Sequence, residues 1–473
     1  MRKLLPPLLF TIFFFVNSIS AQQLTLKKGM IMDKIAIPND SLQEHYSLYL
    51  PSTFDTAKKW PILFVFDLNG KAKQALGVYR EVAENNGYIL AASNNVNDSL
   101  STAQNIIIAN RMINAVKDVL PLHNNRLYAS GFSNAGKFSS IIPIFIKNVE
   151  GVIAIGSGNL NAEILNAKKP FHFIGLVGEE DFRFPEMLTL EKTLNSLKFP
   201  NQLLRYDGGH KWPEKKHLNR ALKILTLSAM AKGFVASDST FIRKSYQEDI
   251  EEMEALVTNN KMLQAEDILE DMLEIYRPHQ SVDALKLRRR ELRKNKSYRS
   301  LRRSENAVLF KESFIKEDYF YSIDEDVSTY NFNNLGWWNY QMAELKKYQE
   351  SPEIAVKKMG KRLYGYVNAL TEDNIEALQA EKKMDEEGIL FLWMLKTIIA
   401  PKEYQYYLNV ISLSAKVGDD DTTLFYLEEL LKNGYTDVDS LYALEHTTLI
   451  KIGPEYNKII DTYLKAARYP TEE

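Results

Sequence analysis

The sequence predicts two regions of different fold class, an α/β region followed by an all-α region. From about residue 40 to about residue 232, short apolar runs alternate with segments of helical periodicity. The runs are continuously apolar, which is typical of strands buried on both faces of a mostly parallel sheet with helices on both sides. From about residue 240 onward these runs stop, and Glu, Lys, Leu and Ala dominate, with apolar residues at helical spacing.

The elements of the first region follow from its pattern in chain order. Strands are predicted around 24–37 and at 45–50, 62–66, 88–92, 126–130, 151–155, 172–177 and 202–206. Helices are predicted at 72–86, 101–119, 134–147, 186–198 and 215–231. The first strands are expected to pair antiparallel, whereas the strands joined by helices are expected to be parallel.

The second region is predicted to consist of paired helices. Segment 246–276 is broken at Asn259-Asn260, and segment 403–433 is broken around Gly418 and ends at Gly434. Two antiparallel helices of about 15 residues form the unit of helical-repeat arrays. Residues 246–473 are therefore interpreted as a tetratricopeptide-like domain. Clean repeats of about 34 residues cannot be counted between 280 and 400, so a degenerate array and an irregular bundle both remain open.

The N-terminal segment has the pattern of a secretory signal peptide. Arg2 and Lys3 precede an apolar stretch from residue 4 to residue 16, and small or polar residues follow up to Ala21. The apolar stretch is shorter than the about 20 residues that span a bilayer. We expect a signal peptide at 1–21, an α/β domain at 22–235, a linker at 236–245 and a helical domain at 246–473. The mature protein is then periplasmic or extracellular.

Composition excludes several classes of function. The 473 residues include no cysteine, which removes disulfides, thiolate nucleophiles and Cys-ligated metal sites. The net charge is −2, so no general attraction to nucleic acid is expected. No phosphate-binding loop, nucleotide fingerprint or metal-spaced His pair occurs in the sequence. We expect no cofactor, no metal, no nucleic-acid partner and no membrane span after signal cleavage.

The first motif that carries chemistry is Gly131-Phe-Ser-Asn-Ala-Gly136, which directly follows a predicted strand and opens a predicted helix. A serine on such a tight turn projects its hydroxyl above the sheet edge, and the cramped backbone requires small neighbours. The N-terminus of the helix favours negative charge on an attacked carbonyl. Ser133 is therefore the candidate nucleophile, although Ala135 replaces the last glycine of the strict Gly-x-Ser-x-Gly pattern.

The second and third motifs also follow predicted strands. Leu176-Val-Gly-Glu-Glu-Asp181 ends in a loop with three acids, of which Asp181 is favoured over Glu180 as the acid of a catalytic triad; a solvated acidic turn is the alternative. Asp207-Gly-Gly-His-Lys-Trp-Pro213 places His210 on a glycine-rich loop. The chain order Ser133, Asp181, His210 matches the triad order Ser, Asp, His on a parallel sheet.

With these motifs, residues 40–232 resemble the α/β-hydrolase superfamily. The Gly-Phe-Ser-Asn-Ala-Gly elbow together with Gly-Gly-His-Lys-Trp-Pro looks like secreted serine esterases of the polyhydroxybutyrate depolymerase and feruloyl-esterase type. The resemblance implies that Ser133 is the nucleophile, His210 the general base and acid, and Asp181 the carboxylate that orients His210. It covers only the first half of the chain.

One stretch departs from the family pattern. Where such hydrolases usually carry His-Gly after the third strand, this sequence has Asp67-Leu68-Asn69-Gly70. An oxyanion hole needs only backbone N–H groups, expected here from Asn134 and from Leu68 or Asn69. We expect the Asp67 carboxylate to accept hydrogen bonds from loop amides, as in an Asx turn, rather than to face the oxyanion.

The sequence thus predicts an exported serine hydrolase, in the first place a carboxylic-ester hydrolase acting on a small-molecule or glycan-linked ester. Trp212 is expected either to line the substrate pocket or to pack the loop of His210. Two other functions remain open. One is an inactive or weakly active hydrolase domain in a helical scaffold that binds protein, and the other is a serine peptidase. For the enzyme as well as for the scaffold, a protein partner or self-association through the C-terminal helices is expected.

Overall fold

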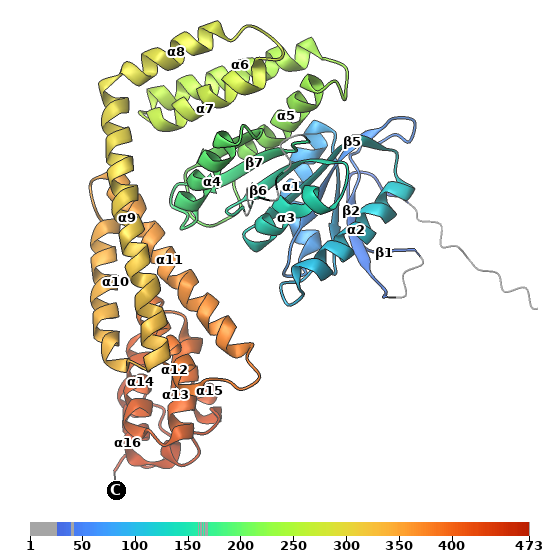
Figure 1. Ribbon diagram of the computed structural model, residues 1–473. Helices are drawn as coiled ribbons and strands as arrows, with labels where there is room; N and C mark the ends of the chain where they lie inside the picture. Colours follow the sequence, from blue (N-terminus) through green and yellow to red (C-terminus); the bar gives the residue numbers. More distant parts are fainter. Residues whose placement is uncertain are drawn as a thin grey trace, which may run out of the picture.

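The computed structural model describes residues 26–38, 42–158, 160, 163, 165 and 169–472. The predicted signal peptide at 1–21 lies outside the described residues. Figure 1 shows an α/β domain, helices that cover one side of it, and a helical arm that leads away to the C-terminus. None of the helices within the described ranges is long and apolar enough to cross a membrane.

A single sheet of eight strands forms the centre of the α/β domain. Its order is β1-β2-β4-β3-β5-β6-β7-β8. The strands are β1 (Ile31–Ala36), β2 (His45–Tyr49), β3 (Trp60–Phe66), β4 (Ile89–Ser93), β5 (Leu122–Phe132), β6 (Val149–Ile155), β7 (His172–Gly178) and β8 (Asn201–Tyr206). β2 pairs antiparallel with β1 and β4, and every other pair is parallel. This is the α/β-hydrolase fold that the motifs predict, including the antiparallel first strands.

Helices cover both faces of the sheet because its central strands are apolar on both sides. Along β3, Ile62, Phe64 and Phe66 face one core, whereas Leu63 and Val65 face the other. The first core lies under α2 (Thr102–Val119), α3 (Asn134–Phe145) and α4 (Phe184–Ser196). The second lies under α1 (Ala72–Asn86) and α5 (Lys215–Ala231). All five helices lie close to their predicted ranges.

The core on the α5 face continues into the helical region. It includes apolar residues of α6 (Ser239–Thr258), α7 (Met262–Tyr276) and α8 (Asp283–Lys294), and it extends to Tyr298 at the start of α9 (Lys296–Thr329). α6 already begins at Ser239, inside the segment 236–245 that the sequence predicts as a linker. The chain therefore crosses from one predicted domain to the next without a break in packing.

The arm consists of α9 and the helices that follow it, and it contains two further apolar cores. The α-helices after α9 are α10 (Leu335–Gln349), α11 (Ile354–Gln379), α12 (Glu386–Ile399), α13 (Tyr404–Val417), α14 (Asp420–Lys432), α15 (Val438–Ala443) and α16 (Pro454–Leu464). The predicted breaks are confirmed, since Asn259 ends α6 and the left-handed Gly418 ends α13. Helix length varies from 6 residues in α15 to 34 in α9. Assignment to tetratricopeptide repeats stays a prediction.

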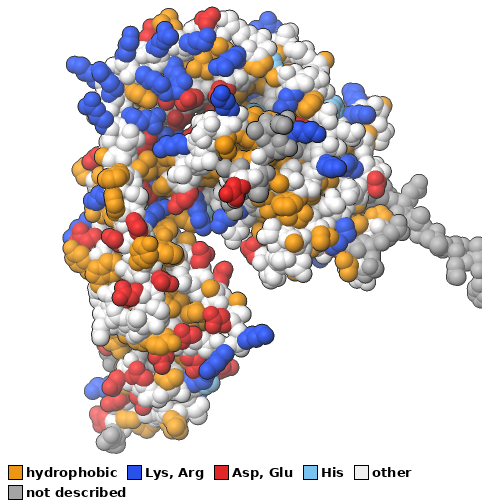
Figure 2. Space-filling model, in the orientation of Figure 1, with side chains coloured by type: hydrophobic (Ala, Val, Ile, Leu, Met, Phe, Trp, Pro, Cys, Tyr) orange, Lys and Arg blue, Asp and Glu red, His pale blue; other side chains and the backbone are white. Residues whose placement is uncertain are grey.

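Basic side chains gather over α8 and the start of α9, as Figure 2 shows at the upper left. Several of them are paired with carboxylates of the neighbouring helices. Arg288 pairs with Glu254 of α6 at 2.7 Å, and Arg289 pairs with Glu266 of α7 at 2.6 Å. Glu266, whose side chain is 1% exposed, also forms an ion pair with Arg293. These pairs hold α8 against the layer of α6 and α7.

A prediction about stability concerns Glu191 on α4. This half-buried carboxyl faces Asp267 and Glu270 of α7, with Arg205 and Arg302 nearby, and burial followed by the two acidic neighbours raises its pKa to about 8. Between about pH 4.5 and pH 8 the folded state therefore binds more protons at this site than the unfolded state, so the free energy of unfolding falls as pH rises.

Glu191→Gln should remove that loss. We expect the variant to be more stable than the wild type at pH 9 by ~1–3 kcal/mol and nearly equal to it at pH 4, as measured by urea unfolding at both values. Equal stability of the two proteins at pH 9 would contradict the raised pKa.

Candidate active site

Three side chains predicted from the sequence meet at one edge of the sheet. β5, β7 and β8 are parallel, so their carboxyl ends share an edge, and Ser133, Asp181 and His210 each follow one of them within four residues. His210 Nε2 lies 3.0 Å from Ser133 Oγ. His210 Nδ1 lies 2.9 Å from Asp181 Oδ2 and 3.0 Å from Oδ1. The three groups form one continuous hydrogen-bonded chain.

Ser133 occupies a backbone conformation that non-glycine residues rarely adopt, with φ 54° and ψ −123°. Small neighbours permit it. A Cβ on Gly131 would lie 2.2 Å from the carbonyl oxygen of Ala135, and one on Gly136 would lie 2.6 Å from that of Ser157. The Ser133 N–H donates to the carbonyl of Ile155 at 2.9 Å, which fixes the turn to β6. The serine therefore projects from a sharp, strained connection between strand and helix.

Asp181 is fully buried, and its carboxylate is held from two sides. Oδ1 accepts a hydrogen bond from the Arg183 N–H at 2.9 Å as well as from His210. Glu180, the alternative acid, instead pairs with Lys361 of α11 at 2.8 Å and does not contact His210. The structure thus places Asp181, and not Glu180, in the chain of three groups.

Aromatic rings fix the imidazole of His210. The centroids of the Phe132 and Phe182 rings each lie 4.7 Å from that of His210. The His210 loop is tied back by the Tyr206 hydroxyl, which donates to the carbonyl of Lys211 at 2.9 Å. The side chain of His210 remains 23% exposed, so the imidazole is accessible to solvent.

Asp67 forms the Asx turn expected from the sequence. Its Oδ1 accepts hydrogen bonds from the N–H groups of Asn69 at 2.9 Å and Lys71 at 3.1 Å. One prediction needs correction here, because the N–H of Asn69 is engaged by Asp67 and is not available as an oxyanion donor. Within the described part of the chain, the N–H groups of Leu68 and Asn134 have no backbone or side-chain acceptor.

A cavity of about 230 Å³ lies beside Ser133. Its walls are formed by the loop after β3, the serine turn and the His210 loop: Phe66, Asp67, Leu68, Asn69, Asp98, Phe132, Ser133, Asn134, Ala135, His210 and Trp212. Both expectations for Trp212, lining the pocket and packing the loop of His210, agree with its position. It lines this cavity, and it also packs against Phe132, with ring centroids 5.3 Å apart.

Asp98 is a residue of the site that the sequence analysis missed. It lies in the cavity wall, and its carboxyl interacts with the side chain of Asn134. Partial desolvation and the nearby Asp67 raise the pKa of Asp98, whereas the Asn134 amide lowers it. No strand end or motif marks Asp98 in the sequence. Asp98 reaches the cavity because the loop after β4 lies beside the loop after β3, and the two loops form a β-bridge between Asn69 and Asn97.

Phe182 is a second residue that the sequence analysis missed, and here a signal was available. An aromatic residue directly after a candidate triad acid is placed to stack on the histidine that the acid orients.

No cluster of three or more His, Asp or Glu side chains that could hold a metal ion occurs in the part of the chain that the structure describes.

Neither the models of known protein families nor the curated proteins give a match to this sequence. Among solved structures, the chain is similar to FphF, a fluorophosphonate-binding serine hydrolase of Staphylococcus aureus, with 12% identity over 42% of this chain and 99% of that chain and a TM-score of 0.35. It is also similar to Est1E from Butyrivibrio proteoclasticus, with 12% identity over 42% of this chain and 100% of that chain and a TM-score of 0.34. An esterase from the archaeon Pyrobaculum calidifontis has 13% identity over 44% of this chain and 88% of that chain, with a TM-score of 0.36.

A prediction about the site concerns Gly178 at the end of β7. A Cβ there would lie 2.2 Å from the carbonyl oxygen of Gly208, in the loop that carries His210. Gly178→Ala should therefore push the Asp181 and His210 loops apart and lower the rate of reaction of Ser133 with a fluorophosphonate by about 100-fold.

Gly77→Ala in α1 is the matched control, because a Cβ there meets nothing within 4 Å. This control should react at the wild-type rate and be equally or more stable. Wild-type reactivity of Gly178→Ala would show that the two loops are not coupled through this contact.

Proposed function

We propose that this protein is an exported serine hydrolase that cleaves carboxylic esters through an acyl-enzyme. Ser133 acts as the nucleophile, His210 as general base and then general acid, and Asp181 as the carboxylate that orients the imidazole. The observation that carries the proposal is the hydrogen-bonded chain from Asp181 through His210 to Ser133, built on a strained turn next to a cavity.

The reaction follows from this geometry in two half-reactions. His210 Nε2 takes the proton of Ser133 Oγ while the oxygen attacks the ester carbonyl, and Asp181 stabilises the resulting imidazolium through Nδ1–H. Collapse of the tetrahedral intermediate breaks the bond to the alcohol, which leaves with the proton from Nε2. Water then repeats the sequence on the acyl-enzyme, releases the acid and returns the proton to Ser133.

Two backbone donors support the developing oxyanion in this proposal. The N–H of Asn134 follows the nucleophile at the N-terminus of α3, and the N–H of Leu68 comes from the loop after β3. The Asx turn supports the second donor indirectly, since it occupies Asp67 Oδ1 with the N–H groups of Asn69 and Lys71. Each such donor typically accounts for ~10²–10³ in turnover.

The size of the cavity favours a short acyl or alcohol group over a long chain. About 230 Å³ is smaller than the ~300–1,000 Å³ that is usual for drug-sized ligands. Trp212 and Phe132 offer apolar contact, whereas Asp67 and Asp98 place two carboxyl groups in the wall. We therefore propose a small neutral or cationic ester, free or attached to a glycan. Export is proposed from the pattern of residues 1–21 alone.

The test of the proposal is reaction of the mature protein with a fluorophosphonate, read by intact mass. The wild type should gain one adduct per chain and Ser133→Ala none, because only an activated hydroxyl attacks the phosphonate. Asn134→Ala is the control, since it keeps the backbone N–H and should still react. A folded wild type that gains no adduct would contradict an active hydrolase and favour the scaffold hypothesis.

Short-chain acyl, acetylated-sugar and feruloyl esters should then be compared with aminoacyl amides. We expect the value of kcat/KM to be higher for the esters, because their alcohol leaves more readily than an amine. A preference for amides over esters of the same acyl group would instead identify a peptidase.

A further prediction concerns charge in the cavity. At pH 8, Asp98→Asn should raise kcat/KM about three- to tenfold for an ester with a negatively charged acyl group, relative to the neutral ester of similar size, because one repelling carboxylate is removed. Asp118→Asn, at the far end of α2, is the control and should change neither value. An unchanged ratio between the two esters in Asp98→Asn would show that this carboxyl does not face the substrate.

A further inference from the structure

The loop that carries Asp181 is held by two different parts of the molecule. Its N–H groups are engaged inside the α/β domain: that of Glu179 donates to the carbonyl of Tyr206 at 2.8 Å, and that of Glu180 to the carbonyl of Gly208 at 2.9 Å. Two of its carbonyl groups, however, accept hydrogen bonds from the helical arm. The loop that carries the triad acid is therefore held by hydrogen bonds from the arm as well as from the α/β domain.

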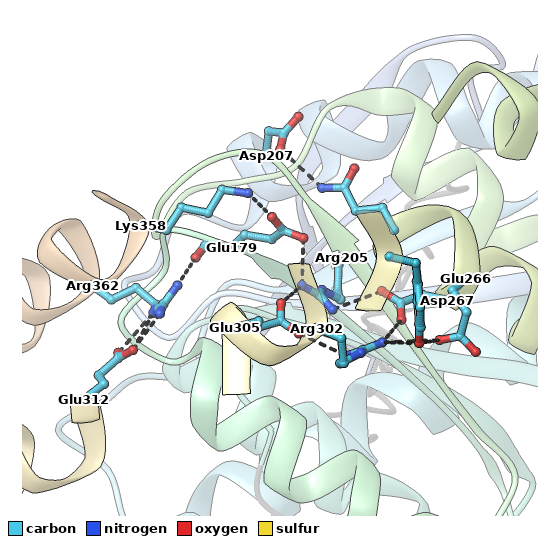
Figure 3. A network of polar contacts seen from close by, with 12 residues as sticks. Glu179, Arg205, Asp207, Glu266, Asp267, Arg302, Glu305, Glu312, Lys358 and Arg362 are labelled. Carbon is cyan, nitrogen blue, oxygen red and sulfur yellow. Dashed lines mark hydrogen bonds and ion pairs between the residues drawn. The ribbon is translucent and has the colours of Figure 1, made fainter. Parts of the chain in front are cut away.

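Arg362 of α11 supplies the first contact. Its Nη1 donates to the carbonyl oxygen of Glu179 at 2.7 Å, and the rest of its guanidinium group forms a bidentate pair with Glu312 of α9. Arg362 and Glu312 are both buried, with side chains 4% and 0% exposed. Figure 3 shows Arg362 between Glu312 and the backbone of Glu179. Because both charged side chains are buried, two helices of the arm fix the position of the Glu179 carbonyl.

Lys316 of α9 supplies the second contact, on the other side of Asp181. Its Nζ donates to the carbonyl oxygen of Phe182 at 2.6 Å and pairs with Glu186 of α4 at 3.0 Å. Lys316 is 8% exposed and lies over the ring of Tyr366, 4.8 Å from the ring centroid. Two cations from the arm therefore bind the carbonyls of the residues two before and one after Asp181.

The same loop touches the general base through Phe182. The Phe182 ring packs on His210 on one side, and on the other it faces α11, where a Cβ on Gly365 would lie 3.5 Å from the ring. That distance is an ordinary van der Waals contact, so α11 lies directly against the ring. A shift of α11 would thus move both the carboxylate and the ring that orient the imidazole.

We propose that helices α9 and α11 position the catalytic acid loop, with Lys316 and Arg362 as positioning residues that act through Asp181 and Phe182. This inference rests on the proposed function, since it assigns the arm a part in the same reaction. It predicts that loss of the arm's contacts slows chemistry while substrate binding and folding are retained. Misplacement of a catalytic group by about 1 Å costs up to ~100-fold in rate.

The primary variant is Lys316→Met, which keeps the length of the side chain and removes the donor. Its other partner, Glu186, is 48% exposed and can be solvated, so the chain should fold. Lys311→Met is the matched control on the same helix. Lys311 donates to the hydroxyl of Tyr348 on α10 at 3.0 Å and does not contact the acid loop.

A second variant removes the other contact. Arg362→Met alone would leave Glu312 buried without a partner and is expected to unfold the arm. Arg362→Met combined with Glu312→Leu replaces both charges with apolar groups of similar volume and should remain folded. Both variants are compared with the wild type by urea unfolding.

Three quantities are measured for each variant: the rate constant and final extent of fluorophosphonate labelling, kcat and KM with one short-chain ester, and hydrogen exchange of the peptide 179–186. For Lys316→Met and for the double variant we expect complete labelling at a rate about tenfold lower, a kcat lowered by a similar factor, a KM within twofold of the wild type, and faster exchange in this peptide. Lys311→Met should match the wild type in all of them.

Two results would overturn the proposal. One is labelling, kcat and exchange in both variants equal to those of Lys311→Met. The other is a smaller labelled fraction with an unchanged rate per active site, which would show that the contacts serve folding alone. If the wild type itself gains no adduct, the proposed function fails, and hydrogen exchange of the peptide 179–186 then tests the positioning contact by itself. Faster exchange in Lys316→Met than in Lys311→Met would support the contact. Equal exchange in the two variants would overturn it.

Discussion

The joining of the two halves of this protein depends on the buried charge of Arg205. This residue lies on β8, the last strand of the sheet, and its side chain is only 4% exposed. Its charge is met by Glu179 of the acid loop at 2.9 Å, by Asp267 of α7 at 3.2 Å and by Glu305 of α9 (Figure 3). A buried guanidinium group without such partners would cost several kcal/mol, so the loop, the covering helix and the arm must all be in place around it.

This constraint explains why the α/β domain and the first helices share one core. Apolar residues of α6, α7 and α8 belong to the same cluster as those of α1 and α5, and the ion pairs of Arg205 lie at its border. The α/β half therefore cannot be separated cleanly near residue 236, where a change of sequence pattern suggests a boundary. The change of sequence pattern from α/β to all-α marks the end of the last strand. It does not mark the end of the shared apolar core.

The sequence was sufficient to predict the sheet and three of the site residues, because each depends on local pattern. The apolar runs of the buried strands and the small residues around Ser133 need no knowledge of distant contacts. Asp181 and His210 could be assigned because each lies just after such a run. The choice of Leu68 over Asn69 as the proposed oxyanion donor could not be made from the sequence. It depends on which backbone N–H donates to Asp67, and that is set by the conformation of the loop.

The contacts between the arm and the acid loop could not be predicted from the sequence for a different reason. Arg362 and Lys316 lie on amphipathic helices, where periodicity indicates the polar face but not its partner, and a charged residue on such a face is usually solvated. Their partners are backbone carbonyls more than 130 positions away in the chain. A backbone carbonyl leaves no mark in a sequence, so neither composition nor spacing could have connected them.

The choice of backbone carbonyls as partners also has a physical consequence. A cation bound to a side chain can be lost when that side chain changes its rotamer, whereas a carbonyl moves only with the chain itself. The contacts of Arg362 and Lys316 therefore act on the path of the loop, and through it on the direction of the Asp181 carboxylate. The buried ion pair of Arg362 with Glu312 contributes little net stability, because desolvation offsets most of the attraction. In the proposal, the contacts with the loop act instead on geometry, on which the proposed transfer of a proton between Ser133 and His210 depends.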